Sequence, residues 1–97
     1  PIHYYRGWFQ DTIPPFAQHD DAPTLALLRL DGDWYESTKV CLEHLYDRVA
    51  EGGMVLIDDY YYWEGCALAV HEFFGARRLT HRIRSLPDYS SAYFIKE

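Results

Sequence analysis

Four aspartates that follow two short apolar segments are the residues of this sequence best suited to chemistry. Asp31 and Asp33 come directly after one apolar run, and Asp58 and Asp59 come directly after Met54–Ile57. Short, nearly continuous apolar runs are typical of strands buried in a parallel sheet. Ligands bind at the carboxyl ends of the strands in such sheets. The pattern therefore predicts that the four carboxylates share one small volume at that edge.

Carboxylates held this close repel one another unless a cation compensates their charge. The nearest basic residue in the sequence is Arg29, which we expect to belong to the strand itself. A divalent metal is the simplest compensation, and all-oxygen ligands favour Mg²⁺, Mn²⁺ or Ca²⁺ over zinc. We expect Asp31, Asp58 and Asp59 to be the metal ligands. Asp33 could then accept the proton of a metal-bound hydroxyl.

Each of these residues also has a purely structural interpretation. Asp33, followed three residues later by Glu36, resembles a capping box, so it could serve only as a helix N-cap. Asp58 and Asp59 could form a polar turn at the end of a strand. The aromatic segment 60–63 could line an acceptor pocket or simply pack. The five histidines share no ligand spacing and are expected at the surface or the edge of the core.

The elements that position the aspartates follow from the spacing of apolar residues. In chain order, we predict a short helix at 8–13, a strand at 24–30, a helix at 35–51, a strand at 54–57, a helix at 65–75, and an antiparallel hairpin of 79–86 with 91–95. Pro14 and Pro15 should stop the first helix, and Gly52–Gly53 the second. The first strand should be covered on both faces. This order predicts an α/β fold with two parallel strands, crossover helices and a C-terminal hairpin.

Composition narrows the classes of function. A net charge of −6 disfavours a nucleic-acid binder, and the basic residues between 77 and 84 are interpreted as a solvated face. No apolar run approaches the roughly 20 residues of a membrane span. Cys41 and Cys66 are expected to be buried free thiols in a reducing compartment, the cytoplasm. The 97 residues are expected to form a single partial domain, cut from something longer because the chain starts at Pro1 without a methionine.

Several linked motifs resemble the macrocin O-methyltransferase (TylF-like) family. The residues that carry the resemblance are Leu28–Asp33, Tyr35–Thr38, Gly52–Gly53 and Ile57–Tyr60, with Gly7–Phe9, Asp11–Thr12, Cys66, Ala69–Val70 and Phe73 around them. Members are class I S-adenosylmethionine-dependent enzymes that methylate sugar hydroxyls of natural products. The resemblance covers the chain up to about residue 74 and implies a partial Rossmann-like sheet.

The resemblance also implies a role for each of the four aspartates. Carried over by motif, Asp31, Asp58 and Asp59 would hold Mg²⁺ and Asp33 would be the general base that deprotonates the sugar hydroxyl. This sequence departs from the family pattern on the acceptor side. Trp34 stands where a smaller aliphatic residue is usual, and a tyrosine follows Asp-Asp-Tyr where glycine is frequent.

The motifs that bind the methyl donor do not occur in this sequence. There is no G-x-G pattern to cradle the amino-acid end of S-adenosylmethionine and no matching acidic residue for its ribose. No residue is therefore assigned to that cofactor. We expect the chain to correspond to the C-terminal half of such an enzyme and to be inactive alone. Its first strand would then expose an edge, which predicts a homo-oligomer.

Two other functions fit parts of the pattern. An apolar strand that ends in Asp-x-Asp is also typical of glycosyltransferases, which hold Mn²⁺ and the diphosphate of a nucleotide sugar. That interpretation leaves Asp58 and Asp59 without a purpose. The chain could instead be a non-catalytic, truncated module that self-associates, with its acids kept as structural metal sites or caps.

Overall fold

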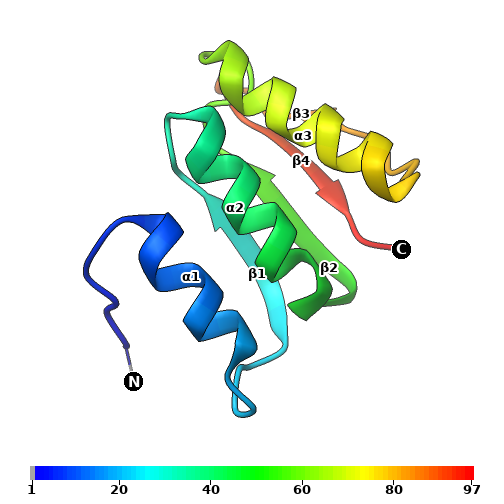
Figure 1. Cartoon of the computed structure of the whole chain (residues 1–97). Helices are drawn as coiled ribbons and strands as arrows, with labels where there is room; N and C mark the ends of the chain where they lie inside the picture. The colour runs from blue at the N-terminus through cyan, green and yellow to red at the C-terminus, as the bar shows by residue number, and fades with distance from the viewer. Residues whose placement is uncertain (1) are drawn as a thin grey trace.

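A computed structural model describes residues 2–97, which form one sheet with three helices on one face (Figure 1). The elements are α1 (Phe9–Gln18), β1 (Leu25–Leu30), α2 (Tyr35–Leu45), the 3-10 turn η1 (Tyr46–Arg48), β2 (Val49–Ile57), α3 (Glu64–Arg77), β3 (Arg84–Ser85) and β4 (Ala92–Ile95). The strand order is β1-β2-β4-β3, with β1 and β2 parallel and the other pairs antiparallel. The predicted α/β fold, with a crossover helix and a closing hairpin, is confirmed.

The hydrophobic core lies between the sheet and the three helices. The buried hydrophobic side chains of the sheet are those of Leu28, Leu30, Val49, Val55, Ile57, Ala92 and Phe94. The buried residues that meet them from the helices include Ala17, Cys41, Leu42, Leu45, Cys66, Val70, Phe73 and Phe74. Both cysteines are buried free thiols, as predicted. Burial raises the pKa of the Cys41 thiol to about 12, so this thiol stays protonated and unreactive.

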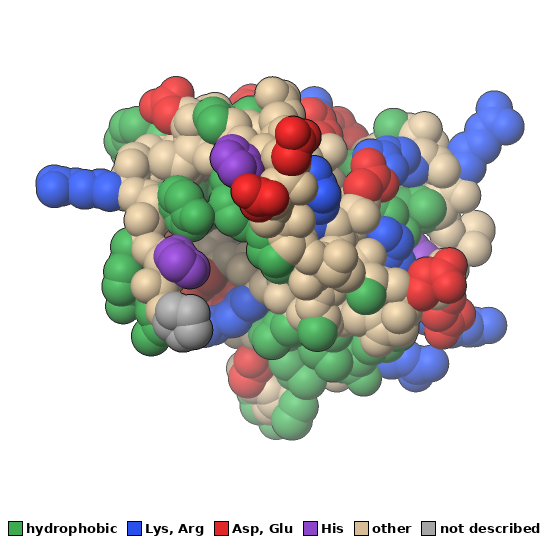
Figure 2. Space-filling view, turned by 90° about the horizontal axis from the view of Figure 1, so that it is seen from below, with side chains coloured by type: hydrophobic (Ala, Val, Ile, Leu, Met, Phe, Trp, Pro, Cys, Tyr) green, Lys and Arg blue, Asp and Glu red, His purple; other side chains and the backbone are tan. Residues whose placement is uncertain are grey.

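No helix among residues 2–97 covers the opposite face of the sheet. Along the second half of β1, buried Leu28 and Leu30 alternate with exposed Leu27 and Arg29, because successive side chains of a strand point to opposite faces. The expectation that this strand is covered on both faces therefore differs from the structure. Hydrophobic side chains gather along the lower side of the view in Figure 2. In the described part of the chain, no helix is both long enough and apolar enough to cross a membrane.

Helix α1 continues through Pro14 and Pro15, which the sequence predicted would stop it. The helix packs one face against the core through Ala17, with partly buried Ile13 and Phe16 beside it. A proline inside a helix removes a backbone hydrogen bond and costs about 3 kcal/mol. Here tertiary burial of the apolar face outweighs the local preference.

Helix α2 ends at Leu45, before the predicted end at residue 51, and strand β2 starts at Val49. Gly52 and Gly53 do not stop the helix; they form an irregularity within β2. Gly52 has a φ of +83° and donates its N–H to the carbonyl of Lys96. The N–H of Lys96 in turn donates to the carbonyl of Gly53. A Cβ on Gly53 would lie 2.8 Å from the carbonyl oxygen of Ala50. Long-range pairing with the end of the chain therefore decides the role of this diglycine.

Candidate metal and acceptor site

The four aspartates lie where β1 and β2 end, as the sequence predicted. Leu30, the last residue of β1, is opposite Ile57, the last residue of β2, so the two strands end level. The N–H of Asp58 donates to the carbonyl of Leu30 at 2.9 Å, which extends the pairing by one residue. This register places the two acidic turns side by side at one edge of the sheet.

Three of the four carboxylates form a close group. Asp31, Asp33 and Asp59 each offer one carboxylate oxygen, and the three atoms lie within 4.8 Å of one another. The pKa of Asp59 is raised by burial and by the neighbouring Asp33 carboxyl. The pKa of Asp31 is raised chiefly by a hydrogen bond with the carboxyl of Asp58. Closely spaced acids of this kind favour either a shared proton or a bound cation.

Arg29 supplies a positive charge that the sequence pattern did not assign to the acids. Its Nη2 donates to Oδ1 of Asp58 at 3.0 Å and lies 3.7 Å from Oδ2 of Asp31. Arg29 and Asp31 are two residues apart, so strand alternation directs both to the same side of the sheet. The two-residue spacing was the signal in the sequence for the contact between Arg29 and Asp31. Asp58 is thus engaged by a cation of the protein itself, and its role as a metal ligand stays a prediction.

Asp33 is not the N-cap of α2, contrary to the structural interpretation of its spacing to Glu36. The N-cap is Trp34, whose side chain makes no capping hydrogen bond, and its carbonyl accepts the N–H of Thr38 at 3.1 Å. Asp33 lies one residue too early to cap. Its carboxylate is exposed and belongs to the acidic group.

Gly32 allows the first acidic turn to pack closely against two helices. A Cβ on this residue would lie 2.8 Å from Cβ of Ser37 in α2 and 3.2 Å from the ring of Phe9 in α1. The carbonyl of Gly32 also accepts a hydrogen bond from the buried thiol of Cys66 in α3, at 3.2 Å. All three helices therefore fix the turn that carries Asp31 and Asp33.

We expect Gly32→Ala to lower the free energy of unfolding by about 1–2 kcal/mol, because the added methyl group overpacks this contact. Gly75→Ala is the matched control, since no atom lies within 4 Å of a Cβ added there. That change should be neutral or slightly stabilising, because alanine is the better helix former. Thermal unfolding followed by circular dichroism measures both variants. Equal midpoints for Gly32→Ala and the unmodified chain would contradict the close packing.

The second acidic turn is held by the connection between β3 and β4. Oγ of buried Ser91 lies 3.0 Å from the carbonyl oxygen of Asp58 and 2.7 Å from the carboxylate of Asp88. The N–H of Tyr61 donates to the carbonyl of Ser90 at 2.9 Å. The sequence analysis did not predict that this connection holds the second acidic turn. The turn-forming composition of the connection was the only signal in the sequence for it.

The aromatic segment that follows the second acidic turn is partly packed against the core and partly exposed. Tyr60 is partly buried and packs against the core. Tyr61, Tyr62 and Trp63 are exposed at the edge that carries the acids. The histidines are exposed or half-buried, as predicted, and none belongs to the acidic group.

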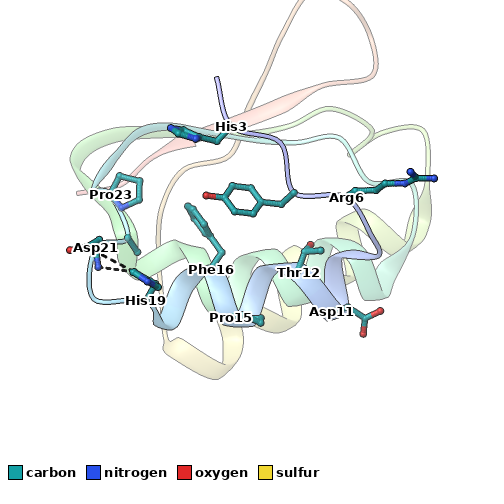
Figure 3. A pocket seen from close by; sticks show the side chains of 11 residues that line it. His3, Arg6, Asp11, Thr12, Pro15, Phe16, His19, Asp21 and Pro23 are labelled. Carbon is teal, nitrogen blue, oxygen red and sulfur yellow. Dashed lines mark hydrogen bonds and ion pairs between the residues drawn. The ribbon is translucent and has the colours of Figure 1, made fainter. Parts of the chain in front are cut away.

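A cavity of about 1090 Å³ lies between the N-terminal segment and α1, apart from the acids (Figures 2 and 3). His3, Phe16 and His19 are among its lining residues, and the ring of Tyr5 meets that of Phe16 edge-on at 5.2 Å. None of the four aspartates lines it. The acidic edge and this cavity are therefore separate features.

Two solved structures that superimpose on this chain are methyltransferases. The O-methyltransferase NovP superimposes with a TM-score of 0.82 and 38% identity, over 93% of this chain and 35% of NovP. CalS11, described as a TDP-rhamnose 3'-O-methyltransferase of calicheamicin biosynthesis, superimposes with a TM-score of 0.78 and 28% identity, over 94% of this chain and 40% of CalS11. The fold is that of a methyltransferase.

The sequence of this chain is also similar to named O-methyltransferases. Over 76 residues it is 47% identical to the 8-demethyl-8-(2,3-dimethoxy-alpha-L-rhamnosyl)-tetracenomycin-C 4'-O-methyltransferase of Streptomyces olivaceus, and over 74 residues 46% identical to the demethyldecarbamoylnovobiocin O-methyltransferase of Streptomyces niveus. These matches cover 76% and 74% of this chain. The sequence model of the Macrocin-O-methyltransferase (TylF) family matches residues 1–96, and the chain belongs to this family. It spans about a quarter of the length of these two relatives, 26% of each.

Proposed function

We propose that this chain carries the metal and acceptor site of a metal-dependent O-methyltransferase that acts on a sugar hydroxyl of a natural product. One observation carries the proposal: carboxylate oxygens of two proposed ligands, Asp31 and Asp59, and of the proposed base, Asp33, lie within 4.8 Å of one another. They lie at the carboxyl ends of parallel strands, where such sheets bind ligands. The relatives support the acceptor class, because one is named for a rhamnosyl-tetracenomycin and a structural neighbour for TDP-rhamnose.

The residues at this edge fit a hard divalent cation. The donors are carboxylate oxygens, which suit Mg²⁺, and equally Mn²⁺ or Ca²⁺. The proposed ligands are Asp31, Asp58 and Asp59. Because Arg29 pairs with Asp58, this ligand set requires the guanidinium to release that carboxylate. The proposal therefore requires the metal to compete with Arg29 for the carboxylate of Asp58.

Asp33 is the proposed general base. A divalent cation at this edge would lower the pKa of an acceptor hydroxyl. The carboxylate of Asp33 takes the hydroxyl proton as the acceptor oxygen gains the methyl group. The fixed turn at Gly32 holds this carboxylate in place, which contributes orientation. We propose S-adenosylmethionine as the methyl donor and assign none of these 97 residues to it.

A chimera tests the proposal. Residues 2–97 replace the matching segment of the Streptomyces niveus enzyme, and methylation of demethyldecarbamoylnovobiocin is measured beside the parent enzyme. We expect EDTA to abolish methyl transfer by the chimera and added Mg²⁺ to restore it. Methyl transfer that is insensitive to the chelator would refute the metal requirement.

Membership in the methyltransferase family argues against the glycosyltransferase interpretation of Asp-x-Asp. The same chain offers a direct check by calorimetry. Tight binding of uridine diphosphate in the presence of Mn²⁺ would reopen that interpretation.

We also propose that the isolated chain forms homo-oligomers through β1. This strand is at the edge of the sheet and has β2 as its one neighbour among the described strands. The free backbone groups of an edge strand can pair with another chain. We expect a sedimentation mass above that of a single chain at micromolar concentration. A monomer mass would count against the proposal.

A further inference from the structure

Two tryptophans occupy the N-cap positions of neighbouring helices without capping them. Trp34 precedes α2 and Trp63 precedes α3, and neither side chain makes a capping hydrogen bond. Serine, threonine, aspartate or asparagine at such a position contributes about 0.5–2 kcal/mol that these residues forgo. Neither residue is buried: Trp34 is 62% exposed and Trp63 is 37% exposed. Neither side chain therefore supplies a helix cap or belongs to the buried core.

The two indoles form a continuous aromatic surface. Their ring centroids are 5.8 Å apart with an interplanar angle of 38°, and the ring of Tyr62 meets Trp63 edge-on at 5.0 Å. Close packing of the two helix starts brings them together, because a Cβ on Gly65 would lie 3.1 Å from Tyr35. We call Trp34, Trp63 and Tyr62 the aromatic platform.

The backbone of each tryptophan follows one of the two acidic turns. Trp34 directly follows Asp33, and the N–H of Trp63 donates to the carbonyl of Asp59 at 3.0 Å. Both helices start at the end of the sheet where β1 and β2 finish (Figure 1). The same two chain segments thus carry both aromatic rings and acidic groups, and small-molecule sites combine a largely apolar surface with a few polar groups.

We propose that the aromatic platform binds the C–H face of a neutral pyranoside whose hydroxyls face Asp33 and Asp59. The assignment of this edge to the acceptor rests on the proposed function. The face of an aromatic ring carries negative charge density, which attracts the polarised C–H groups of a sugar ring. The hydroxyls on the rim of the same ring can donate to the neighbouring carboxylates.

Other occupants fit this surface less well. Without a bound cation, the three grouped carboxylates would repel an anionic ligand, whereas they would not repel a neutral one. A stable protein interface needs about 800 Å² on each partner. Three partly buried aromatic side chains, of roughly 150–250 Å² each, do not supply that area alone. A neutral hydroxylated ring satisfies both the apolar and the acidic part of the surface.

The test uses the 97-residue chain labelled with ¹⁵N and titrated with methyl α-L-rhamnopyranoside in the presence of Mg²⁺. The indole N–H signals of Trp34 and Trp63 should shift and saturate. Trp34→Leu and Trp63→Leu should each weaken affinity at least about fivefold, because leucine keeps apolar volume but lacks the electron-rich face of an aromatic ring. Trp34→Phe should keep part of the affinity. Tyr4→Leu is the control, since Tyr4 is 87% exposed in the N-terminal segment and should leave the affinity unchanged.

Erythritol, which offers vicinal hydroxyls but no ring face, should produce no saturable shift. The platform is refuted by equal binding of erythritol, by full affinity in both leucine variants, or by no saturable shift with the rhamnoside. If a leucine variant does not fold, the unmodified chain provides the test. The largest shifts should then belong to Trp34 and Trp63, and largest shifts elsewhere refute the platform. Calorimetry with Mg²⁺ on the same samples reports the metal site separately. One combined result separates the two proposals: the sugar binds through the tryptophans, and Mg²⁺ does not bind. That result would refute the proposed metal dependence and leave the platform intact.

Discussion

Mg²⁺ should raise the midpoint of thermal unfolding of this chain by roughly 10–20 °C, and Asp59→Asn should remove most of that rise. A ligand at a hundred times its dissociation constant stabilises the folded state by about 2.7 kcal/mol. For a domain of this size, each kcal/mol shifts the midpoint by about 4–8 °C. The effect is expected because the metal would neutralise carboxylates whose pKa values are raised by burial and by one another.

Variants around the acidic edge separate this effect from general salt effects. Without Mg²⁺, Asp59→Asn should raise the midpoint, because it removes one charge from a repelling group. Asp20→Asn, in the exposed loop before β1, should leave the response to Mg²⁺ unchanged. Arg29→Gln should strengthen the response, since it frees the Asp58 carboxylate. The same rise in all four proteins would contradict a metal site at this edge.

Asp33→Asn should lower methyl transfer by the chimera about 10²–10⁴-fold, the usual contribution of a positioned general base. The amide cannot accept the hydroxyl proton, whereas its shape and position are nearly unchanged. Mg²⁺ affinity, measured by calorimetry on the same protein, should be almost intact. Glu36→Gln is the control, because Glu36 is an exposed acid in the first turn of α2. Its methyl transfer should match that of the unmodified chimera.

The close group formed by Asp31, Asp33 and Asp59 makes this experiment discriminating. The structure brings Asp33 together with two proposed ligands, at the distance where it could also coordinate a cation. A parallel loss of metal affinity and methyl transfer in Asp33→Asn would identify Asp33 as a ligand. An isolated loss of methyl transfer would support its role as the base.

The sequence alone determined the two parallel strands, the acids at their carboxyl ends and the closing hairpin. These features depend on short-range patterns, namely apolar runs, helical spacing and turn residues, which carry local information. The linked motifs around the acids also identified the family, which the match over residues 1–96 confirms. Local patterns were less reliable at the ends of elements. Burial carried α1 through Pro14 and Pro15, and pairing with Lys96 drew Gly52 and Gly53 into β2.

Only the tertiary structure decided how the four aspartates divide. Strand register and side-chain alternation bring Arg29 to Asp58 and within 3.7 Å of Asp31, while Asp31, Asp33 and Asp59 form the close group. The packing of α2 against α3 likewise brings Trp34 and Trp63 into contact, although 28 residues separate them in the sequence. Such partnerships depend on the relative placement of distant elements, which a one-dimensional pattern does not encode. The sequence therefore located the acidic edge, and the fold determined which charges and aromatic rings meet there.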